Sequence, residues 1–149
     1  MTEKLEIKVA ADEATLRACW PVMRQLRPHL DESSFVDQAT RQRSTCGYRL
    51  VYAIRATQAK PAPVLGCAGF RITEFMAWGR TLYVDDLVTD VAHRSQGVGA
   101  SLLDWLAAEA RGAGCSQLHL DSGVQRFGAH RFYLTHGMDI TAHHFRLEL

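Results

Sequence analysis

The sequence predicts a mixed α/β fold, because segments with the period of a strand and of a helix follow one another along its 149 residues. Apolar and polar residues alternate at residues 5–9, which is typical of a half-buried strand. A clear helical pattern begins at residue 100, after a turn that follows an apolar strand at residues 82–89. The chain is predicted to form one domain, residues 1–149, long enough to bury about two thirds of its surface.

Two helices and two strands are predicted between the first strand and residue 73. The first helix begins after Asp12, a typical N-cap residue, and its apolar residues keep helical spacing around Pro21. A second helix is expected at about residues 33–43, where two serines provide the cap. Residues 48–56 and 64–73 are then predicted to be strands around a loop that contains two prolines.

The C-terminal half is predicted to alternate helices and strands. An amphipathic helix at residues 100–111 is followed by a short apolar strand at residues 117–121. A second helix is expected at residues 129–136, and a final strand at residues 143–149. The expected order is therefore strand, two helices, three strands, helix, strand, helix and strand.

The turn before the helix at residues 100–111 is the most informative segment, and it has the sequence Arg-Ser-Gln-Gly-Val-Gly at residues 94–99. Free backbone N–H groups and the positive end of the helix dipole meet at such a turn, where phosphate or pyrophosphate binds. Glycine lets the ligand approach the backbone closely. A P-loop is not matched, because no Gly-Lys-Ser/Thr follows. A dinucleotide fingerprint is not matched either, because Leu102 replaces the third glycine.

The form Arg-x-x-Gly-x-Gly resembles the coenzyme A signature of the Gcn5-related N-acetyltransferases (the GNAT family). A second family element, Ala-x-x-aromatic/aliphatic-Tyr followed after three intervening residues by Gly-Phe, is similar to residues 129–133 followed by Gly137-Met138. Two motifs in this order identify residues 48–149 as similar to the family. The resemblance implies a central, mixed, splayed sheet of about seven strands flanked by about four helices.

The resemblance also implies acetyl-CoA as the cosubstrate and no metal. The amides of the turn are expected to bind the pyrophosphate, and the preceding strand is expected to pair with the pantetheine arm. One strand amide would then face the thioester oxygen as an oxyanion donor. Arg126 stands where many relatives have an asparagine that contacts CoA. The cofactor-binding candidates are Leu87, Val88, Thr89, Arg94, Ser95, Gln96, Gly97, Val98, Gly99, Ala100, Arg126 and Tyr133.

Three residues are candidates for catalysis. Tyr133 matches the tyrosine with which family members commonly protonate the departing thiolate; a core tyrosine with a satisfied hydroxyl is the alternative. By its position before the turn, Asp85 matches the carboxylate that accepts the ammonium proton, directly or through water. Asp86 is expected to bind the ammonium or to pair with a basic side chain, and structural hydrogen bonds are the alternative for both aspartates. Regular alternation places the two aspartates on opposite faces, so only one is expected to face the cleft.

The resulting hypothesis is an acyltransferase that moves an acetyl group directly from acetyl-CoA to a primary amine of a small molecule or peptide. The alternative is a CoA-binding module without turnover, acting as a sensor or interaction protein, which the intact Tyr133 and Asp85 disfavour. The net charge of +1 gives no sign of a nucleic-acid partner. Without an apolar N-terminal run, no membrane segment is expected, and the predicted location is cytoplasmic.

The acceptor and the oligomeric state are left open by the sequence. In the family, the first two helices and their connection contribute to the acceptor site, and this region is rich in arginine. These arginines are expected either to bind an anionic group of a substrate or to form a solvated helix face. A homodimer remains open, with Phe75 and Trp78 as candidates for a subunit contact or for an entrance. The four arginines are Arg24, Arg27, Arg41 and Arg43.

Overall fold

The computed structural model describes residues 3–56 and 60–149. The chain divides into two compact units, one that ends at His119 and one that comprises Leu120–Leu149. Within these residues the elements confirm the predicted mixed α/β class, with a sheet of five strands and four α-helices. The sheet of the described residues therefore has fewer strands than the resemblance implied.

The strands lie in the sheet in the order in which they occur in the chain. Each neighbouring pair from the first strand to the fourth is antiparallel. The connection from the fourth strand to the fifth passes through a helix. The strands are β1 (Leu5–Val9), β2 (Arg49–Arg55), β3 (Gly66–Phe75), β4 (Gly79–Thr89) and β5 (Gln117–Leu120).

Three of the helices, α1 (Glu13–Leu26), α2 (Glu32–Cys46) and α3 (Val98–Gly112), belong to the first unit. The predicted cap of α1 is confirmed, because the Asp12 carboxylate accepts a hydrogen bond of 2.8 Å from the Thr15 amide. The second helix begins earlier than expected, since Asp31 and not a serine is its N-cap.

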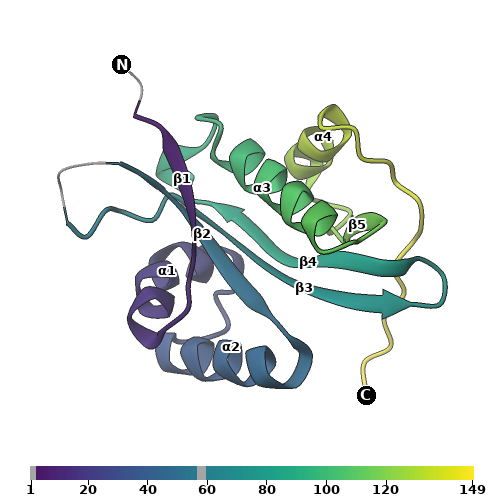
Figure 1. Ribbon diagram of the computed structural model, residues 1–149, viewed down its shortest axis with the longest axis horizontal. Helices are drawn as coiled ribbons and strands as arrows, with labels where there is room; N and C mark the ends of the chain where they lie inside the picture. The colour runs from purple at the N-terminus through teal and green to yellow at the C-terminus, as the bar shows by residue number, and fades with distance from the viewer. Residues whose placement is uncertain (1–2, 57–59) are drawn as a thin grey trace. The chain divides into compact units, whose positions relative to one another are not determined.

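The helices α1 and α2 cover one face of the sheet and α3 covers the other (Figure 1). On the first face, Tyr48 and Cys67 belong to a buried cluster with side chains of α1 and α2. On the second face, Phe70 of β3 contacts Trp105 of α3, with ring centroids 5.9 Å apart. Because both faces are covered, the interior of β2 is buried almost without alternation.

A β-bulge interrupts β4 at Asp85. Phe70 lies opposite Val84, but the adjacent Gly69 lies opposite Asp86, so that Asp85 is an extra residue in its strand. Phe70 and Val84 share the α3 face, and Gly69 and Asp86 share the face covered by α1 and α2. The bulge therefore shifts the alternation of side chains along the second half of β4.

The second unit contains α4 (Phe127–Thr135), none of whose residues is buried. The predicted final strand is wrong for the described chain, because residues 143–149 adopt neither helix nor strand. Phe145, Leu147 and Leu149 do alternate with polar residues, and all three are exposed. Such a pattern is compatible with a strand but does not provide the hydrogen-bonded neighbour that a strand requires.

Candidate active site

The predicted cofactor turn ends in an uncapped helix N-terminus. Gly97 is the N-cap of α3 with φ +80°, and no side chain donates or accepts a capping hydrogen bond there. The turn also holds Ser95 at φ +61°, an uncommon conformation for a residue with a side chain. The Ser101 amide donates to the Gly97 carbonyl over 3.0 Å. The preceding helical amides have no acceptor within the helix, and they belong to Val98, Gly99 and Ala100.

The turn is open to a ligand from outside. The side chains of Arg94, Ser95 and Gln96 are exposed, and Arg55 donates a long hydrogen bond of 3.4 Å to Gln96. A Cβ placed on Gly97 would meet no atom within 4 Å. Free amides, a helix N-terminus and open space are what a pyrophosphate requires, so the residues present fit this part of CoA.

The segment between β4 and the turn is tied to α1 by Gln25. Its side-chain amide donates to Asp90 over 2.8 Å and accepts from the Val91 amide over 2.9 Å. His93 also contacts the Asp90 carboxylate, at 2.6 Å. The hydrogen bonds from Gln25 and His93 lower the pKa of Asp90. These contacts fix the approach to the turn, and the sequence motifs gave no indication of Gln25.

Asp85 and Asp86 both lie at the bulge, and both are committed to ion pairs. The Asp85 carboxylate accepts from the Arg71 guanidinium, from Nε at 3.1 Å and from Nη2 at 2.5 Å. The Asp86 carboxylate accepts from Arg27 Nε at 2.8 Å and from the Tyr48 hydroxyl at 2.8 Å. The side chains are 17% exposed for Asp85 and 11% for Asp86. Buried carboxylates need such partners, which the sequence indicated without identifying them.

The expectation that Asp85 and Asp86 face opposite sides of the sheet is wrong. Arg71 follows Phe70 in β3 and so points away from α3, toward the face covered by α1 and α2. Asp85 pairs with Arg71, and Asp86 pairs with Arg27 at the end of α1, so both carboxylates lie on this face. The cause is the bulge, which breaks regular alternation.

Tyr48 connects the Asp86 carboxylate to the core. Burial raises its pKa well above the ordinary value, and the charges of Asp86 and, more weakly, of Asp85 act in the same direction. The hydroxyl is accommodated because Gly69 has no side chain. A Cβ on Gly69 would lie 1.9 Å from the Tyr48 oxygen and 2.7 Å from Asp86 Oδ2.

A small cavity opens between α1, α2 and β4, next to Asp86. Its volume is about 230 Å³. Arg27 and His29 lie at the end of α1 and in the connection that follows, and Asp86 is one of the predicted site residues. We call it the acceptor cavity. It is also lined by Met23, Leu30, Phe35, Gln38, Ala39, Gln42 and Tyr48.

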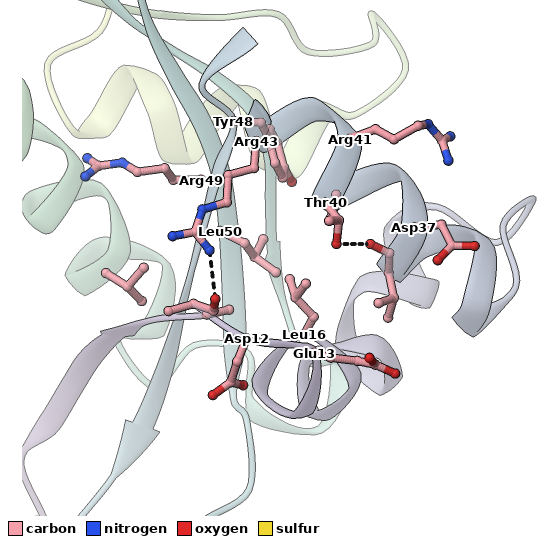
Figure 2. A pocket seen from close by; sticks show the side chains of 15 residues that line it. Asp12, Glu13, Leu16, Asp37, Thr40, Arg41, Arg43, Tyr48, Arg49 and Leu50 are labelled. Carbon is pink, nitrogen blue, oxygen red and sulfur yellow. Dashed lines mark hydrogen bonds between the residues drawn. The ribbon is translucent and has the colours of Figure 1, made fainter. Parts of the chain in front are cut away.

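A larger cavity of about 560 Å³ lies between the N-terminus of α1, the end of α2 and the start of β2 (Figure 2). Its arginines are not free to bind a ligand in its interior. Arg43 donates to the Ala11 carbonyl over 2.7 Å, Arg41 extends away from the cavity, and Arg49 pairs with Glu109 of α3. None of the predicted catalytic or cofactor-binding residues lines it. We therefore do not assign the reaction to this cavity.

Tyr133 and Arg126 belong to the second unit. Arg126 is the N-cap residue of α4 and is exposed, while Tyr133 lies within the helix and is half-buried. Burial raises the pKa of the Tyr133 phenol, and the charge of Arg126 acts weakly in the opposite direction. The phenol therefore keeps its proton at neutral pH, as a proton donor must.

Comparison with known proteins identifies the family. The model of the acetyltransferase (GNAT) family matches residues 14–138. An uncharacterized N-acetyltransferase of Bacillus subtilis, YhdJ, is 33% identical over 114 residues, which are 76% of this chain and 77% of the relative. The chain therefore belongs to the GNAT family of acetyltransferases.

Further relatives match the chain in sequence or in structure. The aminoalkylphosphonate N-acetyltransferase of Salmonella typhimurium is 41% identical over 54 residues, which are 36% of this chain and 35% of that enzyme. A Trypanosoma brucei acetyltransferase has a TM-score of 0.78 and 23% identity, covering 98% of this chain and 100% of its own. An aminoglycoside N-acetyltransferase in complex with CoA has a TM-score of 0.84 and 12% identity, covering 100% of this chain and 97% of its own. The two structures share the fold.

Two further findings concern the described residues as a whole. None of their helices has the length and the apolar run that crossing a bilayer requires. Histidine, cysteine, aspartate and glutamate side chains do not gather there in any group of three able to hold a metal ion.

Proposed function

We propose that the protein is an acetyl-CoA-dependent N-acetyltransferase that acetylates the primary amine of a small molecule by direct transfer. The observation that carries the proposal is the uncapped N-terminus of α3 behind Gly97, with its free amides turned to open space. It follows the strand whose bulge brings Asp86 to the acceptor cavity. One unit of the chain thus holds a site for a pyrophosphate and a site for an amine.

The size and charge of the acceptor cavity favour a small amine that also carries an anionic group. The cavity volume is about 230 Å³. Pockets that bind drug-sized ligands have volumes of at least about 300 Å³. The charge of Asp86 is balanced by Arg27, so the cavity has no excess of negative charge for a polyamine. The relative that acts on aminoalkylphosphonates supports the same substrate class.

Each group of residues would have its own role in the reaction. When bound, acetyl-CoA supplies the thioester that the amine attacks. The α3 amides hold the pyrophosphate, and the β4 segment of Leu87, Val88 and Thr89 orients the pantetheine arm, with one amide stabilising the thioester oxygen. Tyr133 protonates the departing sulfur. The assignment of Asp85 as base stays a prediction, and its use would require the pair with Arg71 to open.

The proposal is tested by binding and by turnover. Calorimetric titration with acetyl-CoA, CoA, ATP and NAD should give binding of the first two only. Release of free thiol from acetyl-CoA should then be fastest with 2-aminoethylphosphonate, compared with spermidine, kanamycin and a lysine peptide. Preferred binding of ATP or NAD, or no thiol release with any amine, would contradict the proposed function. Faster turnover of spermidine or kanamycin would contradict the substrate class alone.

The role of Tyr133 is tested by Tyr133→Phe, which removes the hydroxyl and keeps the ring. We expect kcat to fall about a hundredfold, because general acid catalysis contributes about 10²–10⁴ in rate. The affinity for acetyl-CoA, measured by calorimetry, should change little. An unchanged kcat across the pH range would exclude Tyr133 as the proton donor.

A further inference from the structure

His29 is a histidine of the acceptor cavity that the two family motifs do not include. It lies in the short connection between α1 and α2 and lines the cavity together with Arg27 and Asp86. Its side chain is exposed. Within residues 3–56 and 60–149 its ring makes no hydrogen bond, ion pair or ring contact. An imidazole with free nitrogens therefore faces the space where the amine is proposed to bind.

Acetyl transfer requires a group that removes a proton from the acceptor, because an ammonium ion has no lone pair for attack. The ionisable side chains that face the cavity besides His29 are Arg27, Tyr48 and Asp86. Arg27 has a guanidinium group, which is a hydrogen-bond donor without an acceptor. The Tyr48 hydroxyl donates to Asp86, and burial raises its pKa.

Each oxygen of the two carboxylates at the bulge already accepts a hydrogen bond. The oxygens of Asp86 accept from Arg27 and from Tyr48, one each. Both oxygens of Asp85 accept from Arg71. His29 is thus the ionisable group of the cavity that can accept a proton without breaking a contact of the described structure.

We propose that His29 is the catalytic base of the acetyl transfer, an inference that rests on the proposed function. One N–H bond of the substrate ammonium breaks, and its proton passes to a ring nitrogen of His29, directly or through one water. The freed lone pair forms the C–N bond to the acetyl carbon while the C–S bond breaks. The electron pair of that bond leaves on sulfur, which takes the proton of Tyr133. The attacking nitrogen loses its second proton as the amide forms, and that proton restores the Tyr133 phenol, directly or through water. The imidazolium then returns its proton to solvent.

The test compares His29→Gln with the wild type at saturating acetyl-CoA and 2-aminoethylphosphonate, from pH 5.5 to pH 9.5. Histidines titrate between about pH 5 and 8, and general base catalysis contributes about 10²–10⁴ in rate. We therefore expect kcat at pH 7 to fall about a hundredfold and the rising limb of the pH profile to move to higher pH. Imidazole added to His29→Gly should restore part of the rate.

Controls separate a catalytic role from a structural one. His143→Gln replaces an exposed histidine of the second unit and should leave the pH profile unchanged. The same thermal unfolding midpoint in His29→Gln and wild type would show that the fold is retained. A raised KM with an unchanged kcat and pH profile would assign His29 to binding and overturn the inference alone. No turnover by the wild type with any amine would overturn the proposed function and the inference with it.

Discussion

The cofactor turn presents backbone groups, whereas the acceptor cavity is lined by side chains. At the turn, the backbone is proposed to bind the cofactor: the α3 amides are free, and the side chains of residues 94–96 are exposed. At the cavity, the backbone of Asp86 belongs to the sheet, and the side chains of Arg27 and Tyr48 pair with its carboxylate. A backbone site depends on local conformation, whereas a side-chain site depends on which elements the fold brings together.

The two sites also use glycine for different reasons. Gly97 is needed for its conformation, with φ +80° and open space around it. Gly69 has no unusual φ and is needed for space, because a Cβ would overlap the Tyr48 hydroxyl. Substitutions at these glycines should therefore separate stability from cofactor binding.

The largest effect is expected for Gly69→Ala. A methyl group 1.9 Å from the Tyr48 oxygen would displace that side chain and break its hydrogen bond to Asp86. We expect the free energy of unfolding, measured in urea, to fall by about 3 kcal/mol, at the upper end of overpacking effects. Gly112→Ala is the matched control, since its Cβ would meet nothing within 4 Å. Equal stabilities of the two variants would mean that Tyr48 does not occupy this position.

Gly97→Val should impair cofactor binding at the turn. A branched side chain at positive φ is strained and would stand in front of the free amides. We expect the Kd for CoA, measured by calorimetry, to rise about tenfold to a hundredfold, which is about 1.4–2.7 kcal/mol.

Gly47→Val is the control for Gly97→Val, because Gly47 ends α2 at φ +70° with equally open surroundings. It should carry a similar cost in stability and leave CoA affinity unchanged. A similar loss of affinity in both variants would indicate a general effect of strain and remove the turn from the cofactor site.

The smallest effect is expected for Tyr48→Phe, which leaves one Asp86 oxygen without its donor. We expect a loss of about 1 kcal/mol in the free energy of unfolding at pH 7. Because the pKa of Tyr48 is raised by folding, its neutral form contributes stability that is fully present below the unfolded pKa of about 10 and is lost as pH rises above it. The difference between the variant and wild type should therefore shrink above pH 10 in urea titrations. A difference that stays constant up to pH 11 would contradict the raised pKa.

The cofactor turn could be predicted from sequence because its information is local. Spaced glycines between a strand and a helix specify an open helix N-terminus, and the structure has one at Gly97. The cap at Asp12 and the helical segments are local in the same sense. The prediction of a final strand at residues 143–149 was wrong, because the alternation of apolar and polar residues within a segment does not specify which strand it pairs with.

The sequence alone could not predict which residues lie together at the acceptor cavity. Arg71, Tyr48 and Arg27 are 14, 38 and 59 residues from the aspartates they bind. Two aspartates in an apolar strand indicate that partners exist, but no spacing rule identifies them. Gln25 and His29 are ordinary surface residue types, and only the packing of α1 against β4 gives them neighbours.

The bulge at Asp85 lets β4 carry one residue more than its neighbour without turning either end of the strand over. The strand contains one residue more than β3 needs opposite it, so Val84 and Asp86 point to opposite faces although they are two residues apart. Deleting Asp85 would make the pairing regular, with Val84 still opposite Phe70 and Asp86 still opposite Gly69, so both ends of the strand would keep their faces. The extra residue therefore adds a second carboxylate to the face of α1 and α2 and leaves the rest of the strand in register.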